Sequence, residues 1–153
     1  MEPLNTSVFD CQPDPDNPGW LSWNLVDKTR FNGHAMGHII VRREGDKGAR
    51  VRMMPGRQHS NLHNNMHGGA ILAIIDVALF GGAAVVLGPE LGGAVTLDLS
   101  AQFIGAGQLG VPLDVVTEVL KETKRMVFVR GLVEQNDHLV ASFSGTLRKP
   151  SRA

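Results

Sequence analysis

The stretch from Gly68 to Gly88 restricts the fold of this chain more than any other, and Asp76 is its only charged residue. Its length approaches the ~20 apolar residues that a membrane-spanning helix requires. However, an aspartate near its centre would cost about 2.5–3.5 kcal/mol on membrane-insertion scales, and no Lys or Arg lies close to either end. A helix that is apolar on all sides is equally expected inside a protein core. We therefore predict a core helix, with no membrane partner, from near His67 or Gly68 to about Leu87.

Apolar runs on both sides of this helix predict strands. GHIIVRRE and ARVRMMP are expected to form two strands joined by a tight turn at residues 45–48, because GDKG supplies turn residues. In AVTLDLSAQFI, apolar residues from Val95 to Phe103 alternate with polar ones, as in a strand with one face on a core. Three valine-rich runs follow with short connections: PLDVVTEVLKE, RMVFVRGLVEQ and HLVASFSGTLRK. This order predicts an α+β domain in which an antiparallel sheet of about six strands wraps around one long central helix.

The beginning of the chain is divided by its composition. Four prolines among aspartates and asparagines, up to Pro18, predict a flexible arm over residues 1–19. The stretch from Trp20 to Val26 has Trp20, Trp23 and Leu25 on one side, which is typical of one or two helical turns. We expect the folded domain to span residues 20–153.

Charge and cysteine content exclude several classes of protein. Lys plus Arg equals Asp plus Glu, so no basic surface favours nucleic acid or an acidic membrane. Cys11 is the only cysteine, which leaves no internal disulfide and no thiolate metal cluster. The first residues also lack the basic and apolar regions of a secretory signal. We therefore expect a cytoplasmic protein.

Three histidines before the helix have the spacing of a zinc site. His59, His63 and His67 are four residues apart, which on a helix places imidazoles on one face. However, NLHNNMHGG contains three asparagines and two glycines, which are poor helix formers. No Glu follows the first histidine. We therefore expect no metal and no cofactor, and we expect His59 and His63 to be loop residues that bond to the backbone.

The helix itself carries a second candidate site. The first N–H groups of a helix have no intrahelical partners, and a ligand can approach closely where Gly68 and Gly69 have no side chains. Such amides, at the positive end of the helix dipole, suit a carbonyl oxygen that becomes an oxyanion. Asp76 lies about two turns further on, where burial of a carboxylate is costly. A buried aspartate bonded to a strand hydroxyl is the structural alternative, but we favour a functional role.

A distance separates these two groups. Gly68 and Asp76 are eight residues apart, which is about 12 Å along a helix axis. An oxyanion site and a nucleophile must both lie within about 3 Å of the reacting atoms. One helix therefore does not supply both to the same substrate, whereas two antiparallel copies do. The spacing predicts a two-fold dimer, or a dimer of dimers, with composite sites.

These residues resemble a known family, the hotdog-fold acyl-CoA thioesterases, in particular the phenylacetate-pathway branch. The resemblance rests on Asn61 and the HGG motif that begins at His67, with an aspartate nine residues after that histidine. It also includes FNGHAMG, AVTLDLSAQFIGAGQLG and LVASFSGTLRK, and covers roughly residues 20–149. It implies an enzyme that splits an acyl-CoA thioester into free CoA and a carboxylic acid.

The resemblance also implies roles for five residues. Asp76 corresponds to the nucleophile or general base, and the choice between these two roles stays open. Gly68 corresponds to the residue whose N–H polarises the thioester carbonyl, and Asn61 to one that helps to bind the carbonyl or the water. Thr96 corresponds to the residue that orients the nucleophile. His67 matches the family histidine, which shapes the start of the helix.

The remaining expectations concern the substrate. Gly69 is expected to contribute to its binding, and the CoA phosphates are expected to meet basic residues near strand ends: Lys124, Arg125, Arg148 and Lys149. An ordinary solvated turn is the alternative for these four. The acyl group, aliphatic or aryl, stays open. The competing functions are a hotdog-fold hydratase, which would need a histidine acting at the substrate's α and β carbons, and a non-catalytic acyl-CoA-binding protein.

Overall fold

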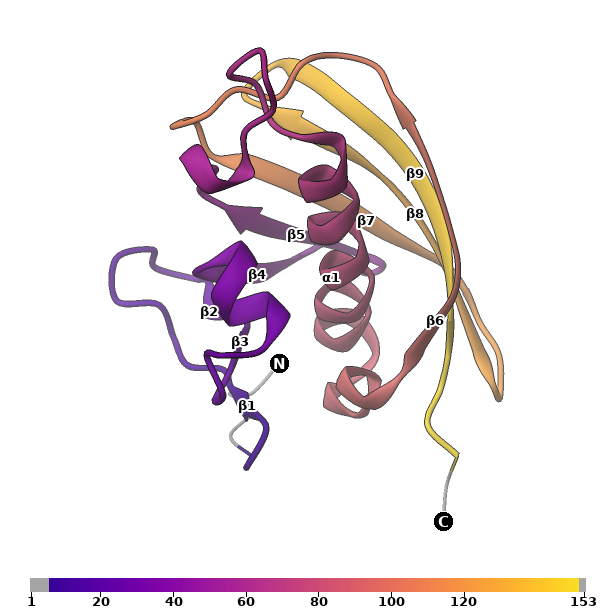
Figure 1. Ribbon diagram of the computed structural model, residues 1–153. Coiled ribbons are helices and arrows are strands. Elements are labelled where there is room, and N and C mark those ends of the chain that lie inside the picture. Colours follow the sequence, from indigo (N-terminus) through magenta and orange to yellow (C-terminus); the bar gives the residue numbers. More distant parts are fainter. Residues whose placement is uncertain (1–5, 152–153) are drawn as a thin grey trace.

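A curved antiparallel sheet wraps around one long helix in the computed structural model, which describes residues 6–151 (Figure 1). The seven strands follow the order β2-β4-β5-β7-β8-β9-β6. In that order they are Leu21–Ser22, Ile39–Glu44, Gly48–Met53, Leu113–Glu122, Met126–Gln135, His138–Arg148 and Val95–Phe103. The predicted α+β hotdog architecture is confirmed, and the short strand β2 adds a seventh strand to the expected six.

Helix α1 (Gly68–Leu87) begins and ends where the sequence predicted. His67 is its N-cap, and the Nδ1 atom of this side chain accepts a hydrogen bond from the Gly69 N–H at 2.9 Å. Gly88, with φ of 142°, ends the helix. Among the described residues it is the one helix long and apolar enough to cross a membrane, but 61% of its most apolar window is buried within the protein. The prediction of a core helix is confirmed.

The helix packs closely on the concave face of the sheet. Ile74, Ile75 and Leu79 are fully buried, and each such side chain contributes about 1.5–3 kcal/mol through its removal from water. Gly82 allows this approach, because a Cβ atom there would lie 2.3 Å from the Thr117 hydroxyl on β7. The position of α1 across the sheet is therefore fixed by both burial and close contact.

Strand β6 forms one edge of the sheet and pairs only with β9 among the described strands. The predicted strand is confirmed, but its expected burial is only partly right. Leu99 packs against the core, whereas Val95, Leu97 and Phe103 are 45%, 52% and 51% exposed. The reasons are a β-bulge between Thr96 and Asp98 and the position at the edge, where no further strand covers the apolar side chains.

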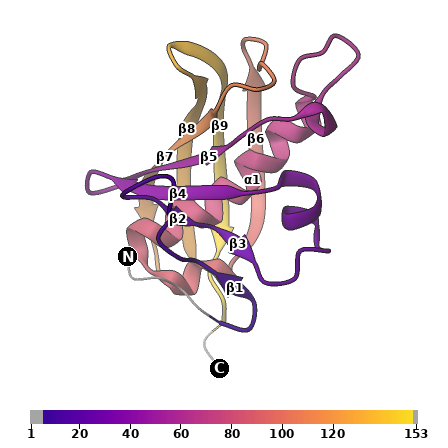
Figure 2. The same cartoon turned by 90° about the vertical axis from the view of Figure 1, so that its left-hand side faces the viewer.

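The prediction of helical turns over residues 20–26 was wrong. This stretch is extended and contributes β2 and β3 (Asn24–Leu25). The Trp23 N–H donates to the Ile39 carbonyl at 2.7 Å, and β2 pairs with β4. The three-residue spacing of Trp20 and Trp23 suits a helix, but pairing with a distant strand determines the backbone. Figure 2 shows the N-terminal strands beside β4.

The N-terminal segment also differs from the expected loose arm. Strand β1 (Phe9–Asp10) pairs with β3 in a second, two-stranded sheet. Cys11 is fully buried in the core, and this burial raises the pKa of its thiol to about 11. The Asp14 carboxylate is 2.7 Å from the His38 ring. Residues 6–18 therefore pack on the domain, while residues 1–5 lie outside the described part. The boundary between residues 19 and 20 stays a prediction.

Candidate active site

Asp76 lies midway along α1 and is held by one neighbour on the sheet. The Thr96 hydroxyl donates to Asp76 Oδ1 at 2.7 Å. The bulge in β6 makes this contact possible, because it turns Thr96 toward the helix together with the later residues Leu99 and Ala101. Asp76 Oδ2 accepts no hydrogen bond from residues 6–151. One oxygen is thus oriented and the other is available to a ligand.

The structural alternative for Asp76 required a buried and fully paired carboxylate. Asp76 does bond to a strand hydroxyl, but it is only partly buried and borders a pocket. A carboxylate with one free oxygen at a pocket wall is suited to accept a proton or to attack a carbonyl carbon.

The start of α1 presents one available amide. The Gly68 N–H makes no hydrogen bond to the described residues, whereas the Gly69 N–H donates to His67. The Phe103 ring of β6 lies beside Gly68. A Cβ atom added to this glycine would be 3.4 Å from the ring, which is an ordinary van der Waals contact. Gly68 is therefore the better donor for an incoming oxygen, and Gly69, expected to bind substrate, is already engaged.

Asn61 shapes the loop that leads into the helix. Its Oδ1 atom accepts hydrogen bonds from the His63 and Asn65 N–H groups at 2.8 and 3.2 Å. Its Nδ2 atom lies 3.4 Å from the Met66 carbonyl. The same residue that was predicted to bind carbonyl or water thus holds the approach to the helix start.

His63 and His67 lie outside regular secondary structure, as predicted, whereas His59 ends the short 3-10 helix η2 (Arg57–His59) and is not a loop residue. His59 is buried, its Nδ1 atom accepts from the Gly56 N–H at 2.9 Å, and its Nε2 atom is 2.6 Å from the Ala35 carbonyl. His63 is exposed in the turn. No group of three His, Cys, Asp or Glu side chains within residues 6–151 is arranged to hold a metal ion.

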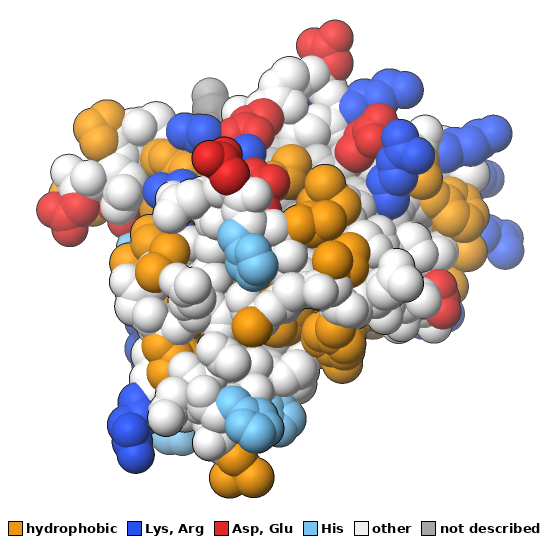
Figure 3. All heavy atoms as spheres, turned by 90° about the horizontal axis from the view of Figure 1, so that it is seen from above, with side chains coloured by type: hydrophobic (Ala, Val, Ile, Leu, Met, Phe, Trp, Pro, Cys, Tyr) orange, Lys and Arg blue, Asp and Glu red, His pale blue; other side chains and the backbone are white. Residues whose placement is uncertain are grey.

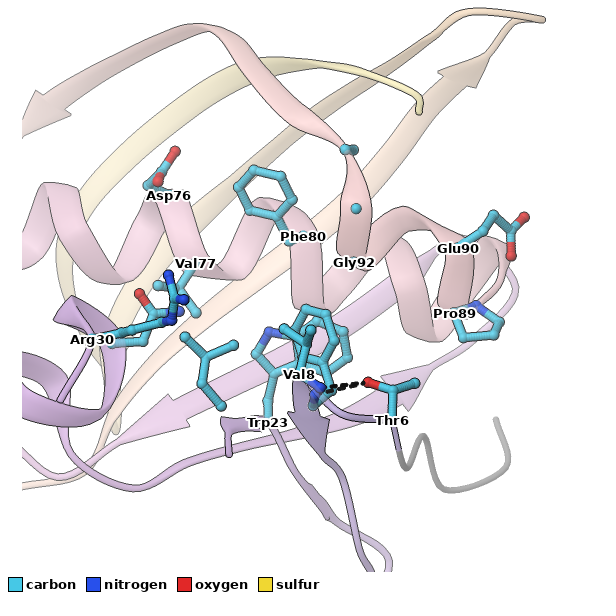
Figure 4. A pocket seen from close by; sticks show the side chains of 15 residues that line it. Thr6, Val8, Trp23, Arg30, Asp76, Val77, Phe80, Pro89, Glu90 and Gly92 are labelled. Carbon is cyan, nitrogen blue, oxygen red and sulfur yellow. Dashed lines mark hydrogen bonds between the residues drawn. The ribbon is translucent and has the colours of Figure 1, made fainter. Parts of the chain in front are cut away.

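A pocket of about 820 Å³ lies between α1 and the N-terminal segment (Figure 4). Asp76 borders it, and Trp23 and Phe80 lie further along it. Phe9 also lines it, as does Arg30, which the sequence did not single out. A possible signal was the apolar Val8–Phe9 pair inside an otherwise polar, proline-rich arm.

The predicted site residues therefore form two groups on or beside α1, and the predicted basic residues lie apart from both groups. Asn61, His67 and Gly68 lie at the start of α1, while Asp76 and Thr96 lie at its middle. Lys124 and Arg125 are exposed in the turn between β7 and β8, and neither lines the pocket. Arg148 is the last residue of β9, and Lys149, which follows it, forms an ion pair with Glu122. The role of these four in CoA binding stays a prediction.

The end of the molecule at which α1 begins carries both apolar and charged areas. Seen from this end, apolar side chains and histidines lie among uncharged atoms, and most charged side chains lie in the upper half of the view, some of them beside a central histidine (Figure 3). Along α1, five of the residues that are not buried repeat at helical spacing and form a stripe, in which two are exposed and three are partly buried: Gly69, Leu72, Ala73, Asp76 and Phe80. This stripe, the exposed stripe of α1, carries one charge among apolar residues.

The sequence and the structure are both similar to known proteins. Residues 63–142, more than half of the chain, match the sequence profile of the thioesterase superfamily. A Pseudomonas aeruginosa protein, provisionally named an esterase, is 30% identical over 116 residues, which are 75% of this chain and 85% of that protein.

Solved structures share the fold. The PaaI protein of the Escherichia coli phenylacetic acid degradation operon superposes with a TM-score of 0.67 at 21% identity, over 81% of this chain and 87% of that chain. A hypothetical thioesterase from Streptococcus pneumoniae, solved with coenzyme A, gives a TM-score of 0.64 at 17% identity, over 74% and 90% of the two chains.

Proposed function

We propose that this chain, which belongs to the thioesterase superfamily, hydrolyses an acyl-CoA thioester to free CoA and a carboxylic acid. The observation that carries the proposal is the Asp76 carboxylate, with one oxygen held by Thr96 and the other without a partner in residues 6–151, at the wall of a pocket of about 820 Å³. The similar Streptococcus pneumoniae structure was solved with coenzyme A, which supports CoA as the carrier of the acyl group. We also propose that the protein acts in the cytoplasm, because its net charge is zero and it has a single cysteine.

In one route, Asp76 is the general base. Asp76 takes a proton from a water molecule, and the resulting hydroxide adds to the thioester carbonyl carbon. The carbonyl oxygen becomes an oxyanion, which accepts a hydrogen bond from the Gly68 N–H. The intermediate then collapses, the carbon–sulfur bond breaks, and the CoA thiolate takes the proton from Asp76. The products are CoA thiol and a carboxylic acid.

In the other route, Asp76 is the nucleophile. Its free oxygen attacks the carbonyl carbon, and loss of the CoA thiolate leaves an acyl–aspartyl anhydride. Water then cleaves this anhydride: its hydroxyl joins the acyl carbon and its remaining proton goes to the CoA thiolate, which releases the acid and CoA thiol and regenerates the Asp76 carboxylate. Both routes need the Thr96 hydrogen bond, because it fixes which oxygen of Asp76 faces the substrate.

The proposed site is shared by two chains. Gly68 and Asp76 lie on the same helix, eight residues or about 12 Å apart, too far to act on one carbonyl. Two features support a partner in antiparallel orientation: the exposed stripe of α1, and the edge strand β6 with its exposed apolar side chains. An edge strand of nine residues with no second neighbour among the described strands is also a ready pairing surface.

The two alternatives differ in what they require. A hydratase would need a histidine beside the substrate's α and β carbons, but no histidine lines the described pocket. A non-catalytic acyl-CoA-binding protein would not need a partly exposed carboxylate held by a hydroxyl at the pocket wall. Neither alternative is favoured by a specific contact of this chain.

The test is hydrolysis of acetyl, medium-chain, long-chain and aryl CoA thioesters, measured as thiol release. We expect turnover of at least one class, and Asp76→Asn should lower kcat by about 10²–10⁴-fold while the melting temperature is retained. Lack of turnover across the panel would contradict the proposal. A variant with a lowered melting temperature but normal kcat would make Asp76 a structural residue instead.

A further inference from the structure

We infer that the N-terminal segment from Thr6 to Phe9 forms the wall that limits acyl-chain length, and that the pocket takes an extended apolar acyl chain. This inference rests on the proposed function, because it places the thioester carbonyl at Asp76. It adds the class of acyl group and the residues that select it, Val8 and Phe9.

The segment is held in place by specific hydrogen bonds. The Val8 and Phe9 N–H groups both donate to the Thr6 hydroxyl, at 3.1 and 2.9 Å. The Val26 N–H donates to the Val8 carbonyl at 2.9 Å, and β1 continues this pairing with β3. The side chains of this segment therefore face the pocket from a fixed backbone.

Aromatic rings join this segment to the opposite wall. The Phe9 and Trp23 ring centroids are 5.3 Å apart. A Cβ atom on Gly81 of α1 would lie 3.4 Å from the Trp23 ring, and one on Gly92 would lie 3.1 Å from the Phe9 ring. The two rings thus fill the space between α1 and the turn η3 (Pro89–Gly93) that follows it. Because the Phe9 and Trp23 rings are packed in this way, the wall has little space into which it could move to admit a longer ligand.

The distribution of polar groups gives the direction of the acyl chain. Arg30 and Asp76 lie at one end of the pocket, while Trp23 and Phe80 lie further along it (Figure 4). A carbonyl at Asp76 would therefore direct the acyl chain toward the rings. The volume of about 820 Å³ is far more than an acetyl group fills. Each additional buried methylene should improve kcat/KM about fourfold, until the chain reaches the wall.

Two neighbouring valines provide a matched experiment. Val8 and Val26 are bonded through their backbones and are almost equally exposed, at 52% and 51%, but only Val8 lines the pocket. We would measure kcat/KM with saturated acyl-CoA substrates of increasing length for wild type, Val8→Trp and Val26→Trp. Val8→Trp should shorten the preferred chain by at least two methylenes and lower kcat/KM for the longest good substrate more than tenfold. Val26→Trp should leave the profile unchanged.

The opposite change is made at Phe9. Phe9→Ala should lengthen the preferred chain. If Phe9→Ala does not fold, Val8→Trp decides alone, because Val8 is half-exposed and outside the core. A Val8→Trp profile that keeps its wild-type optimum, or falls equally for all lengths, would overturn the inference. A wild-type protein that hydrolyses no CoA thioester would instead overturn the proposed function.

Discussion

The hydrogen bond between Thr96 and Asp76 offers a direct measure of how strongly the sheet orients the carboxylate. Thr96→Val replaces the hydroxyl by a methyl group of similar size, so the contact surface is kept while the 2.7 Å hydrogen bond to Asp76 Oδ1 is lost. A hydrogen bond to a charged group contributes about 1.5–3 kcal/mol. If that amount acts on the transition state, it corresponds to a decrease in kcat of about 10–150-fold.

The assay is steady-state thiol release with the best CoA thioester of the wild-type protein. The decrease should appear in kcat, with KM within about threefold of wild type, because Thr96 orients Asp76 and does not hold the CoA. Thr146→Val is the matched control, since Thr146 lies on the adjacent strand, paired with Asp98, and has no hydrogen bond to Asp76. Full activity of Thr96→Val, or an equal loss in Thr146→Val, would refute the orienting role.

Three further predictions concern stability, each measured by urea unfolding. Burial would raise the pKa of Asp114, but hydrogen bonds from Arg52 and Arg50 outweigh it and hold that pKa below its ordinary value. Asp114→Asn should therefore cost about 2 kcal/mol at pH 7, less than the cost for a fully buried pair because the arginines are partly exposed. Since a lowered pKa contributes its full stabilisation above the unfolded value and loses it as pH falls toward the folded value, the difference should shrink as pH falls below about 4; a gap that does not shrink between pH 4 and pH 2 would contradict this. His67→Ala should cost about 1 kcal/mol through loss of the N-cap, and His67→Asn should restore most of it; equal stability of both variants would contradict a capping role. Gly131→Ala should cost about 3 kcal/mol or more, because its Cβ atom would lie 2.0 Å from a backbone carbonyl oxygen of β7; wild-type stability would contradict that packing.

The parts of the fold that depend on local pattern were predictable from the sequence. The helix from Gly68 to Leu87 has a glycine beyond its end and an apolar composition that needs a core around it. The strands of the C-terminal meander are marked by valine-rich runs and by turns such as the one at Asn136, whose φ is 52°. The residues that make up each of these signals lie close together in the sequence, so they can be recognised without knowledge of distant contacts.

The parts that depend on distant contacts were not predictable. Trp20 and Trp23 have helical spacing, yet the backbone between them is extended because it pairs with β4. Phe9 and Cys11 lie in a proline-rich stretch and are held by contacts with Trp23 and the core. The bulge next to Thr96 changes which residues of β6 face the helix, and strict alternation gives no sign of it.

The candidate site divides in the same way. The motif around Gly68 and the single charge at Asp76 are visible in the sequence, and the contact of Asp76 with Thr96 was expected from the resemblance and is present in the structure. The pocket wall at Val8 and Phe9 comes from a segment far from α1 in the sequence. A wall assembled from such separate segments has no sequence pattern of its own.

The most direct test of the proposed shared thioester site is a heterodimer of two differently disabled chains. One chain carries Asp76→Asn and the other Gly68→Pro, which removes the amide donor at the first helical position, where proline is tolerated. Gly68→Ala is the control, because it adds a similar contact with Phe103 while keeping the N–H, and it should stay active. Each disabled homodimer should be nearly inactive, and the purified heterodimer should recover about half of wild-type activity from its single intact site. A folded, paired heterodimer as inactive as its parents would contradict a site shared between two chains.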